Sequence, residues 1–164
     1  MKSISKYPFL WFVLLCGTIS FCADAQEIKV IRFAELEQLI SESKSKVTVV
    51  NFWATWCKPC LEEIPSFKTI SEKYRLKDVN LLLVSLDFAK DVERVKAFAT
   101  RKDIGNHVVL LNEPDYNSWI DKIDPKWSGA LPATVLLTET GKEFYEKKFE
   151  GDELEKRVKT LLNN

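Results

Sequence analysis

Apolar residues along the chain fall into two kinds of pattern. Residues 46–54 and 79–87 are continuous β-branched, aliphatic and aromatic runs, which are typical of strands buried on both faces. Elsewhere, and most clearly over 57–74, apolar residues recur every three or four positions, which predicts amphipathic helices. The predicted strands span 28–32, 46–54, 79–87, 107–112, 132–138 and 142–149, and the predicted helices span 33–40, 57–74, 91–100, 115–123 and 152–162, with Asp152 as N-cap of the last. This order predicts an α/β fold with a central mixed β-sheet flanked by helices on both faces.

Residues 1–25 have a different pattern. Two lysines precede an apolar run at 9–21, and an Ala-x-Ala sequence follows it, which is the three-part pattern of a secretory signal. The apolar run is shorter than the roughly 18 residues expected of a membrane-spanning helix. We therefore expect a cleaved signal peptide at 1–25 and one domain at 26–164 that works in the periplasm. A retained N-terminal membrane anchor is the alternative.

The charges of the chain are balanced. It has 24 basic and 24 acidic residues, and loss of residues 1–25 would leave 22 basic and 23 acidic ones. Such a balance gives no indication of binding to nucleic acid or to an anionic membrane surface. The length of 26–164 suits a single domain with a real core, and we expect a monomer.

Two cysteines, Cys57 and Cys60, remain outside the expected signal peptide, three positions apart and directly after a predicted buried strand. A disulfide between them closes almost no loop, so it would stabilise the fold little. A zinc site would need two more strong ligands, and 26–164 has no further cysteine and only one histidine, His107. His107 itself is expected to be a packing or surface residue. The pair therefore indicates redox chemistry, with no metal.

Cys57 is predicted at the N-terminus of a helix, where unpaired amides and the helix dipole stabilise a thiolate. This predicts Cys57 as the attacking thiol and Cys60, one turn deeper, as the resolving thiol. Lys58 adds a positive charge nearby, and Pro59 fits the first turn of a helix.

Glu63 lies three residues after Cys60, about 60° around the helix from it. A partly buried carboxylate there could carry the proton of Cys60 in and out, as a general acid and base. On periodicity alone, a surface charge is an equally good interpretation of Glu63, whereas Glu62 is turned further away, towards solvent. Four tryptophans are expected in the core by default: Trp53, Trp56, Trp119 and Trp127.

Two segments, VVNFWATWCKPCLEEIPSF at 49–67 and GALPATVLLTETGKEF at 129–144, give the sequence a family resemblance. It resembles the extracytoplasmic TlpA/ResA-like thiol-disulfide oxidoreductases of the thioredoxin superfamily, over nearly all of 26–164. The resemblance implies a thioredoxin-like fold with an extra helix-strand insert at 87–112. It also implies a redox-active Cys57–Cys60 disulfide and a catalytic carboxylate at Glu63. Asn51 stands where thioredoxin has a buried aspartate.

The resemblance further implies a cis peptide between Leu131 and Pro132 that faces the cysteines and pairs with an incoming chain. The expected substrate-binding residues are Trp56, Lys58, Pro59, Leu131 and Pro132. The implied activity is reduction of protein disulfides, with electrons from a membrane thiol carrier and with apocytochromes c among the substrates. No cofactor is expected, because the glycines of 26–164 are isolated and form no phosphate-binding loop. The alternative from another class is a docking module that keeps an idle disulfide.

Overall fold

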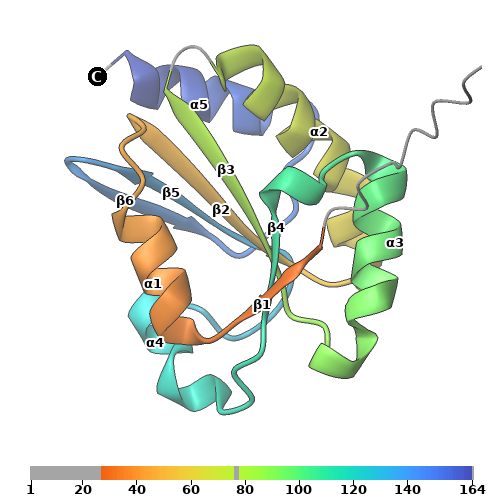
Figure 1. Ribbon diagram of the computed structural model, residues 1–164. Helices are drawn as coiled ribbons and strands as arrows, with labels where there is room; N and C mark the ends of the chain where they lie inside the picture. Colours follow the sequence, from red (N-terminus) through yellow and green to blue (C-terminus); the bar gives the residue numbers. More distant parts are fainter. Residues whose placement is uncertain (1–26, 76–77, 164) are drawn as a thin grey trace, which may run out of the picture.

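The computed structural model describes residues 27–75 and 78–163, which form a mixed six-stranded sheet with helices on both faces (Figure 1). The strand order is β1-β4-β3-β2-β5-β6, in which β1 to β4 are mutually parallel, β5 is antiparallel to β2, and β6 is antiparallel to β5. The strands are β1 (Lys29–Ile31), β2 (Val47–Trp53), β3 (Val79–Ser85), β4 (Val108–Leu111), β5 (Ala133–Thr138) and β6 (Gly141–Tyr145). The predicted mixed α/β sheet is thus confirmed. The expected signal peptide lies outside the described residues and stays a prediction.

Two sets of helices cover the two faces of the sheet. The α-helices are α1 (Phe33–Ser41), α2 (Lys58–Tyr74), α3 (Val92–Lys102), α4 (Ile120–Ile123) and α5 (Glu153–Leu162); short 3₁₀ turns lie at η2 (Ala89–Asp91), η3 (Gly105–His107) and η4 (Tyr116–Ser118). One hydrophobic core lies under α2, α3 and α5, and the other under α1 and α4. The region expected as an insert, 87–112, contains α3 and β4.

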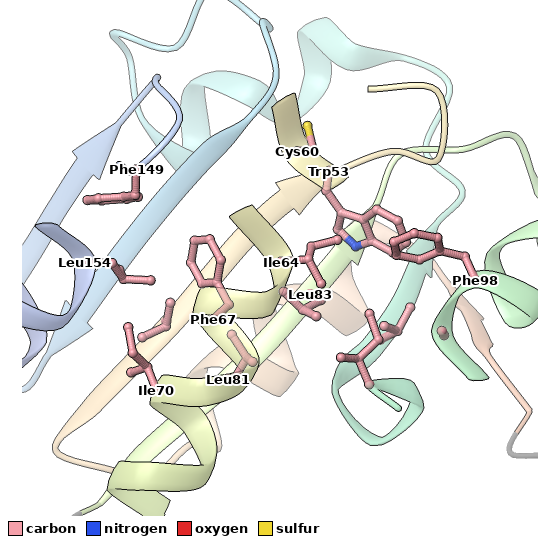
Figure 2. Packing of buried hydrophobic residues seen from close by; sticks show 14 of the residues in the cluster. Trp53, Cys60, Ile64, Phe67, Ile70, Leu81, Leu83, Phe98, Phe149 and Leu154 are labelled. Carbon is pink, nitrogen blue, oxygen red and sulfur yellow. The ribbon is translucent and has the colours of Figure 1, made fainter. Parts of the chain in front are cut away.

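Strand β2 is buried along its whole length, as its continuous apolar sequence predicts. Its alternate residues belong to opposite cores: Val49 and Trp53 to the first, Val50 and Phe52 to the second. Figure 2 shows the first core, in which Trp53 packs beside Phe98 of α3 with ring centroids 5.2 Å apart. Strand β2 lies in the middle of the sheet, between its parallel neighbour β3 and its antiparallel neighbour β5. The carboxyl ends of such strands are a common location for sites in open α/β sheets.

Three predicted elements differ from the structure. Strand β6 ends at Tyr145, because the chain beyond it turns towards α2, where Phe149 packs edge-on to Phe67 with ring centroids 6.3 Å apart. The helix predicted over 115–123 is split into η4 and the single turn of α4. Asp152 is the N-cap residue of α5, but its side chain makes no capping hydrogen bond and pairs instead with Lys156 at 2.9 Å.

Candidate active site

Cys57 and Cys60 form a disulfide where β2 leads into α2, with their Cα atoms 5.3 Å apart. Cys57 is the N-cap residue of α2, and its Sγ accepts a hydrogen bond of 3.3 Å from the backbone N–H of Cys60. Cys57 is 6% exposed, whereas Cys60 is fully buried. The sulfur nearer to solvent is therefore the one at the helix N-terminus, where partial positive charge stabilises a thiolate.

The residues around the pair present a mixed surface. Lys58 and Pro59 occupy the exposed first turn of α2, as predicted. The expectation that Trp56 belongs to the core is wrong, because its side chain is 64% exposed. Trp56 lies in the turn after β2, so it has no sheet face to pack against, while Trp53, Trp119 and Trp127 are buried as expected. Trp56 instead places a large aromatic surface beside Cys57.

The peptide between Leu131 and Pro132 is cis, as the resemblance implied. Ala133 of β5 pairs with Phe52 of β2, so Pro132 lies at the same end of the sheet as the disulfide. Pro132 is buried, and Leu131 is half-buried and packs against both hydrophobic cores. The two signature segments, far apart in the sequence, thus meet at the carboxyl end of β2.

Glu63 is almost completely buried, at 2% exposure, so the surface-charge interpretation is wrong. Its Oε1 accepts a hydrogen bond of 2.9 Å from Asn51 Nδ2 of β2, and its Oε2 accepts one of 2.9 Å from the backbone N–H of Phe149. Burial raises the pKa of Glu63 to about 7, although the hydrogen bonds from Phe149 and Asn51 act in the opposite direction. At neutral pH this carboxyl can therefore both accept and return a proton.

The neighbouring Glu62 is exposed, as its helical position predicted. Lys148 Nζ lies 2.8 Å from its Oε2, and this hydrogen bond lowers the pKa of Glu62. Two adjacent glutamates on one helix thus have opposite environments, and only Glu63 has the pKa of a proton carrier near pH 7.

His107 lies away from the disulfide. It belongs to η3, at the start of β4, while the cysteines follow the end of the parallel β2. It is half-buried, its Nε2 lies 3.3 Å from Ser71 Oγ, and burial lowers its pKa. This agrees with a packing role.

Sequence reasoning missed Asp87, which lies two residues after the end of β3. Its side chain is fully buried and is bonded to Thr55, two residues before Cys57. The available signal was a single aspartate at the carboxyl end of a buried strand, the edge of the sheet where the cysteines also lie.

A thioredoxin-like sheet with a Cys-X-X-Cys disulfide at the N-terminus of the helix after its central strand defines a thiol-disulfide oxidoreductase. The sequence profile described as Redoxin matches residues 33–162, and the chain belongs to this family. The predicted resemblance of the chain to the ResA-like thiol-disulfide oxidoreductases of the thioredoxin superfamily is confirmed.

Curated relatives agree with this class, and a solved structure agrees with the fold. The chain is 28% identical to the thiol-disulfide oxidoreductase ResA of Bacillus cereus, over an alignment of 157 residues that covers 86% of each chain. It is 30% identical over 105 residues to the thioredoxin-like protein YneN of Bacillus subtilis, covering 62% of this chain and 56% of YneN. The fold matches a thioredoxin-related protein from Neisseria meningitidis serogroup B with a TM-score of 0.65 at 20% identity, covering 76% of this chain and 91% of that one.

Proposed function

We propose that this protein reduces disulfides of exported proteins outside the cytoplasm, with Cys57 and Cys60 as its reacting dithiol. The observation that carries the proposal is the Cys57–Cys60 disulfide at the N-terminus of α2, with the buried carboxyl of Glu63 three residues further along the same helix. This arrangement supplies a stabilised attacking thiolate, a resolving thiol and a proton carrier.

The proposed reaction moves two electrons from the dithiol to the substrate. The Cys57 thiolate attacks one sulfur of a substrate disulfide and forms a mixed disulfide, while the other substrate sulfur leaves as a thiolate and takes a proton. Cys60 then loses its proton and attacks Cys57 Sγ, which closes the Cys57–Cys60 disulfide and releases the second substrate thiolate. An external dithiol must reduce Cys57–Cys60 before the next turnover.

Glu63 is the proposed base for the second step. Cys60 is fully buried, and burial in apolar surroundings raises the pKa of a thiol and opposes its ionisation. Asn51 cannot accept a proton, whereas Glu63, with a pKa of about 7, can take the proton from Cys60 and return it in the reverse direction.

The surface around Cys57 is the proposed substrate site. Trp56 offers an exposed aromatic ring, and Lys58 and Pro59 are exposed on the first turn of α2. Leu131 and the cis-Pro132 lie at the same end of the sheet, where the backbone of an extended substrate segment could pair with them.

The proposed location rests on the signal-like pattern of residues 1–25. Among the helices of 27–75 and 78–163, none combines the length and the apolar character that a membrane span requires. Resemblance to the TlpA/ResA-like proteins favours a membrane thiol carrier as the reductant and exported proteins, apocytochromes c among them, as substrates.

Reduction of insulin disulfides with dithiothreitol as electron source tests the activity. We expect the wild-type protein to accelerate insulin precipitation and the Cys57→Ser/Cys60→Ser double variant to leave the uncatalysed rate unchanged. Equal rates for the two proteins would favour the alternative, a docking module with an idle disulfide. A reduction potential measured against a glutathione buffer tests whether the pair is poised to reduce or to oxidise.

A further inference from the structure

Asp87 is a buried carboxylate with no part in the reaction described above. It lies two residues after the end of β3, and its side chain has no exposed surface. A buried carboxylate is costly unless several donors satisfy it. Asp87 has such donors: Oδ2 accepts from the Thr55 N–H and from Ser85 Oγ, both at 2.8 Å, and Oδ1 accepts from Thr55 Oγ1 and, at 3.2 Å, from Arg94 Nη2.

These bonds continue the pairing of β2 with β3 past the ends of both strands. The Leu86 N–H donates to Trp53 O at 2.8 Å, and the Thr55 N–H then donates to the Asp87 side chain. The chain next turns so that the Cys57 N–H donates to Ala54 O at 3.1 Å. The segment that leads into Cys57 is thus fixed to the end of β3, and at its other end the Leu61 N–H of α2 donates to Cys57 O at 3.1 Å.

Arg94 closes the network from α3. Its Nε donates to Thr55 Oγ1 at 2.8 Å while its Nη2 contacts Asp87, so one guanidinium bridges both residues. The same Nη2 lies 3.3 Å from Asp91 Oδ2, at the start of α3. The side chain of Arg94 is 54% exposed, whereas that of Asp87 is buried, so the arginine balances the buried charge from the solvent side.

We propose that Asp87 is a positioning residue for thiol-disulfide exchange, which holds Thr55 and thereby keeps Cys57 Sγ at the N-terminus of α2 in the reduced protein. The role matters most in that state, because opening the disulfide removes the covalent link between the Cys57 side chain and Cys60 of the helix. Sγ then depends on its backbone for its place beside the helix amides, and small misplacements of reacting groups have large effects on rate. This inference rests on the proposed function, in which Cys57 is the attacking thiol.

The test compares Asp87→Ala with Asp87→Asn, both in a Cys60→Ser background that isolates Cys57. The readout is the rate at which the Cys57 thiolate attacks dithiobis(nitrobenzoate), which forms a mixed disulfide and releases one coloured nitrobenzoate thiolate. Both variants remove the charge, but the asparagine keeps an oxygen that can accept from the Thr55 N–H. We expect Asp87→Ala to slow the reaction on the order of tenfold and Asp87→Asn to recover most of the rate.

Amide hydrogen exchange at Thr55 supplies a second readout, which should show protection lost in the alanine variant and kept in the asparagine variant. The tether is the hydrogen bond from the Thr55 N–H to the Asp87 side chain. Equal slowing in both variants would show that the charge of Asp87 matters and the tether does not, and it would overturn the proposal. Wild-type rates in both, or lost protection at Thr55 with an unchanged rate, would overturn it as well.

A surface pair of variants covers the case in which Asp87→Ala does not fold. Arg94→Met removes the bridge to Thr55 and Asp87, whereas Asp91→Asn removes only the outer partner of Arg94. We expect Arg94→Met to slow the Cys57 reaction by about threefold, a fraction of the effect of cutting the tether itself, and Asp91→Asn to leave it unchanged. Equal rates in these two variants would count against the proposal. None of these readouts needs a protein substrate. Failure of the wild-type protein to reduce insulin would refute the proposed function, and that result is obtained in a separate assay.

Discussion

Asn51 Nδ2 donates a hydrogen bond of 2.9 Å to Glu63 Oε1, between a strand and a helix that are both buried at this point. The same nitrogen donates to Thr134 Oγ1 of β5 at 3.0 Å, while Asn51 Oδ1 has no hydrogen-bond partner among the protein atoms of 27–75 and 78–163. The amide therefore directs one of its two N–H donors at the carboxyl, an orientation that favours the charged form of Glu63. Asn51 and the Phe149 N–H together limit how far burial raises the pKa of Glu63.

Replacing Asn51 should therefore make Glu63 a weaker acid. In Asn51→Leu we expect the pKa of Glu63 to rise further, because the carboxylate loses a donor and gains no water. If Glu63 is the base, the resolution rate should increase with pH through a midpoint near 7 in the wild-type protein, and through a midpoint about one pH unit higher in Asn51→Leu. Stopped-flow measurement of resolution from pH 5 to 9 checks this.

Thr134→Val is the matched control for Asn51→Leu. It removes the other acceptor of Asn51 Nδ2 but leaves the Glu63 contact in place, so its midpoint should stay close to that of the wild-type protein. Identical midpoints in all three proteins would show that the Asn51 contact does not tune Glu63.

Glu63→Gln should keep the fold and still form the mixed disulfide at Cys57, but resolution by Cys60 should slow. The expected loss is roughly 10²-fold or less, the lower part of the range for acid-base catalysis, because water can partly substitute. Glu62→Gln is the control, since Glu62 is exposed and pairs with Lys148. Stopped-flow kinetics between pH 6 and 8 decides: equal resolution rates in the wild-type protein and Glu63→Gln would leave Glu63 without a catalytic role.

The order of attack can be tested by trapping. Cys60→Ser should accumulate a mixed disulfide with substrate, because Cys57 attacks and nothing resolves the product, whereas Cys57→Ser should trap nothing. The reason is the difference in position, since Cys57 is at the helix N-terminus and is the more exposed sulfur. Mass spectrometry of the adduct locates the bond, and an adduct on Cys60 would reverse the assignment.

Local sequence patterns predicted the parts of the fold that depend on local physics. The apolar run of β2 and the helical spacing of α2 placed Cys57 at a strand-helix junction, and that placement is observed. Helix geometry also separated Glu62 from Glu63, although it could not decide whether Glu63 is buried. That depends on Phe149, 86 positions further on, whose N–H bonds to the carboxylate.

Two other features depend on contacts that no local pattern contains. Trp56 is exposed because it lies in the turn beyond β2, three positions after the buried Trp53, which is the last residue of that strand. The tether from Asp87 to Thr55 spans 32 positions and joins the ends of two parallel strands. Its existence depends on which strands are neighbours in the sheet, and the order β3-β2-β5 emerges only from the assembled topology.

Glu63 should also make the stability of the protein depend on pH. Its pKa is about 7 in the folded protein against an ordinary value of 4.5, so the folded state holds a proton that the unfolded state releases between these values. The stability that Glu63 contributes is therefore fully present below about pH 4.5 and decreases as the pH rises, until it levels off above about pH 7. The size of this loss is about 3 kcal/mol in the free energy of unfolding.

Urea unfolding of the oxidised protein at pH 5 and pH 8 measures this loss, with Glu63→Gln as the reference because glutamine cannot titrate. Because the unfolded state has already released part of this proton at pH 5, we expect the wild-type protein to lose about 2.5 kcal/mol more than Glu63→Gln between the two pH values. If both proteins lose the same amount, the carboxyl of Glu63 does not have a raised pKa, and its role as a proton carrier at neutral pH loses its physical basis.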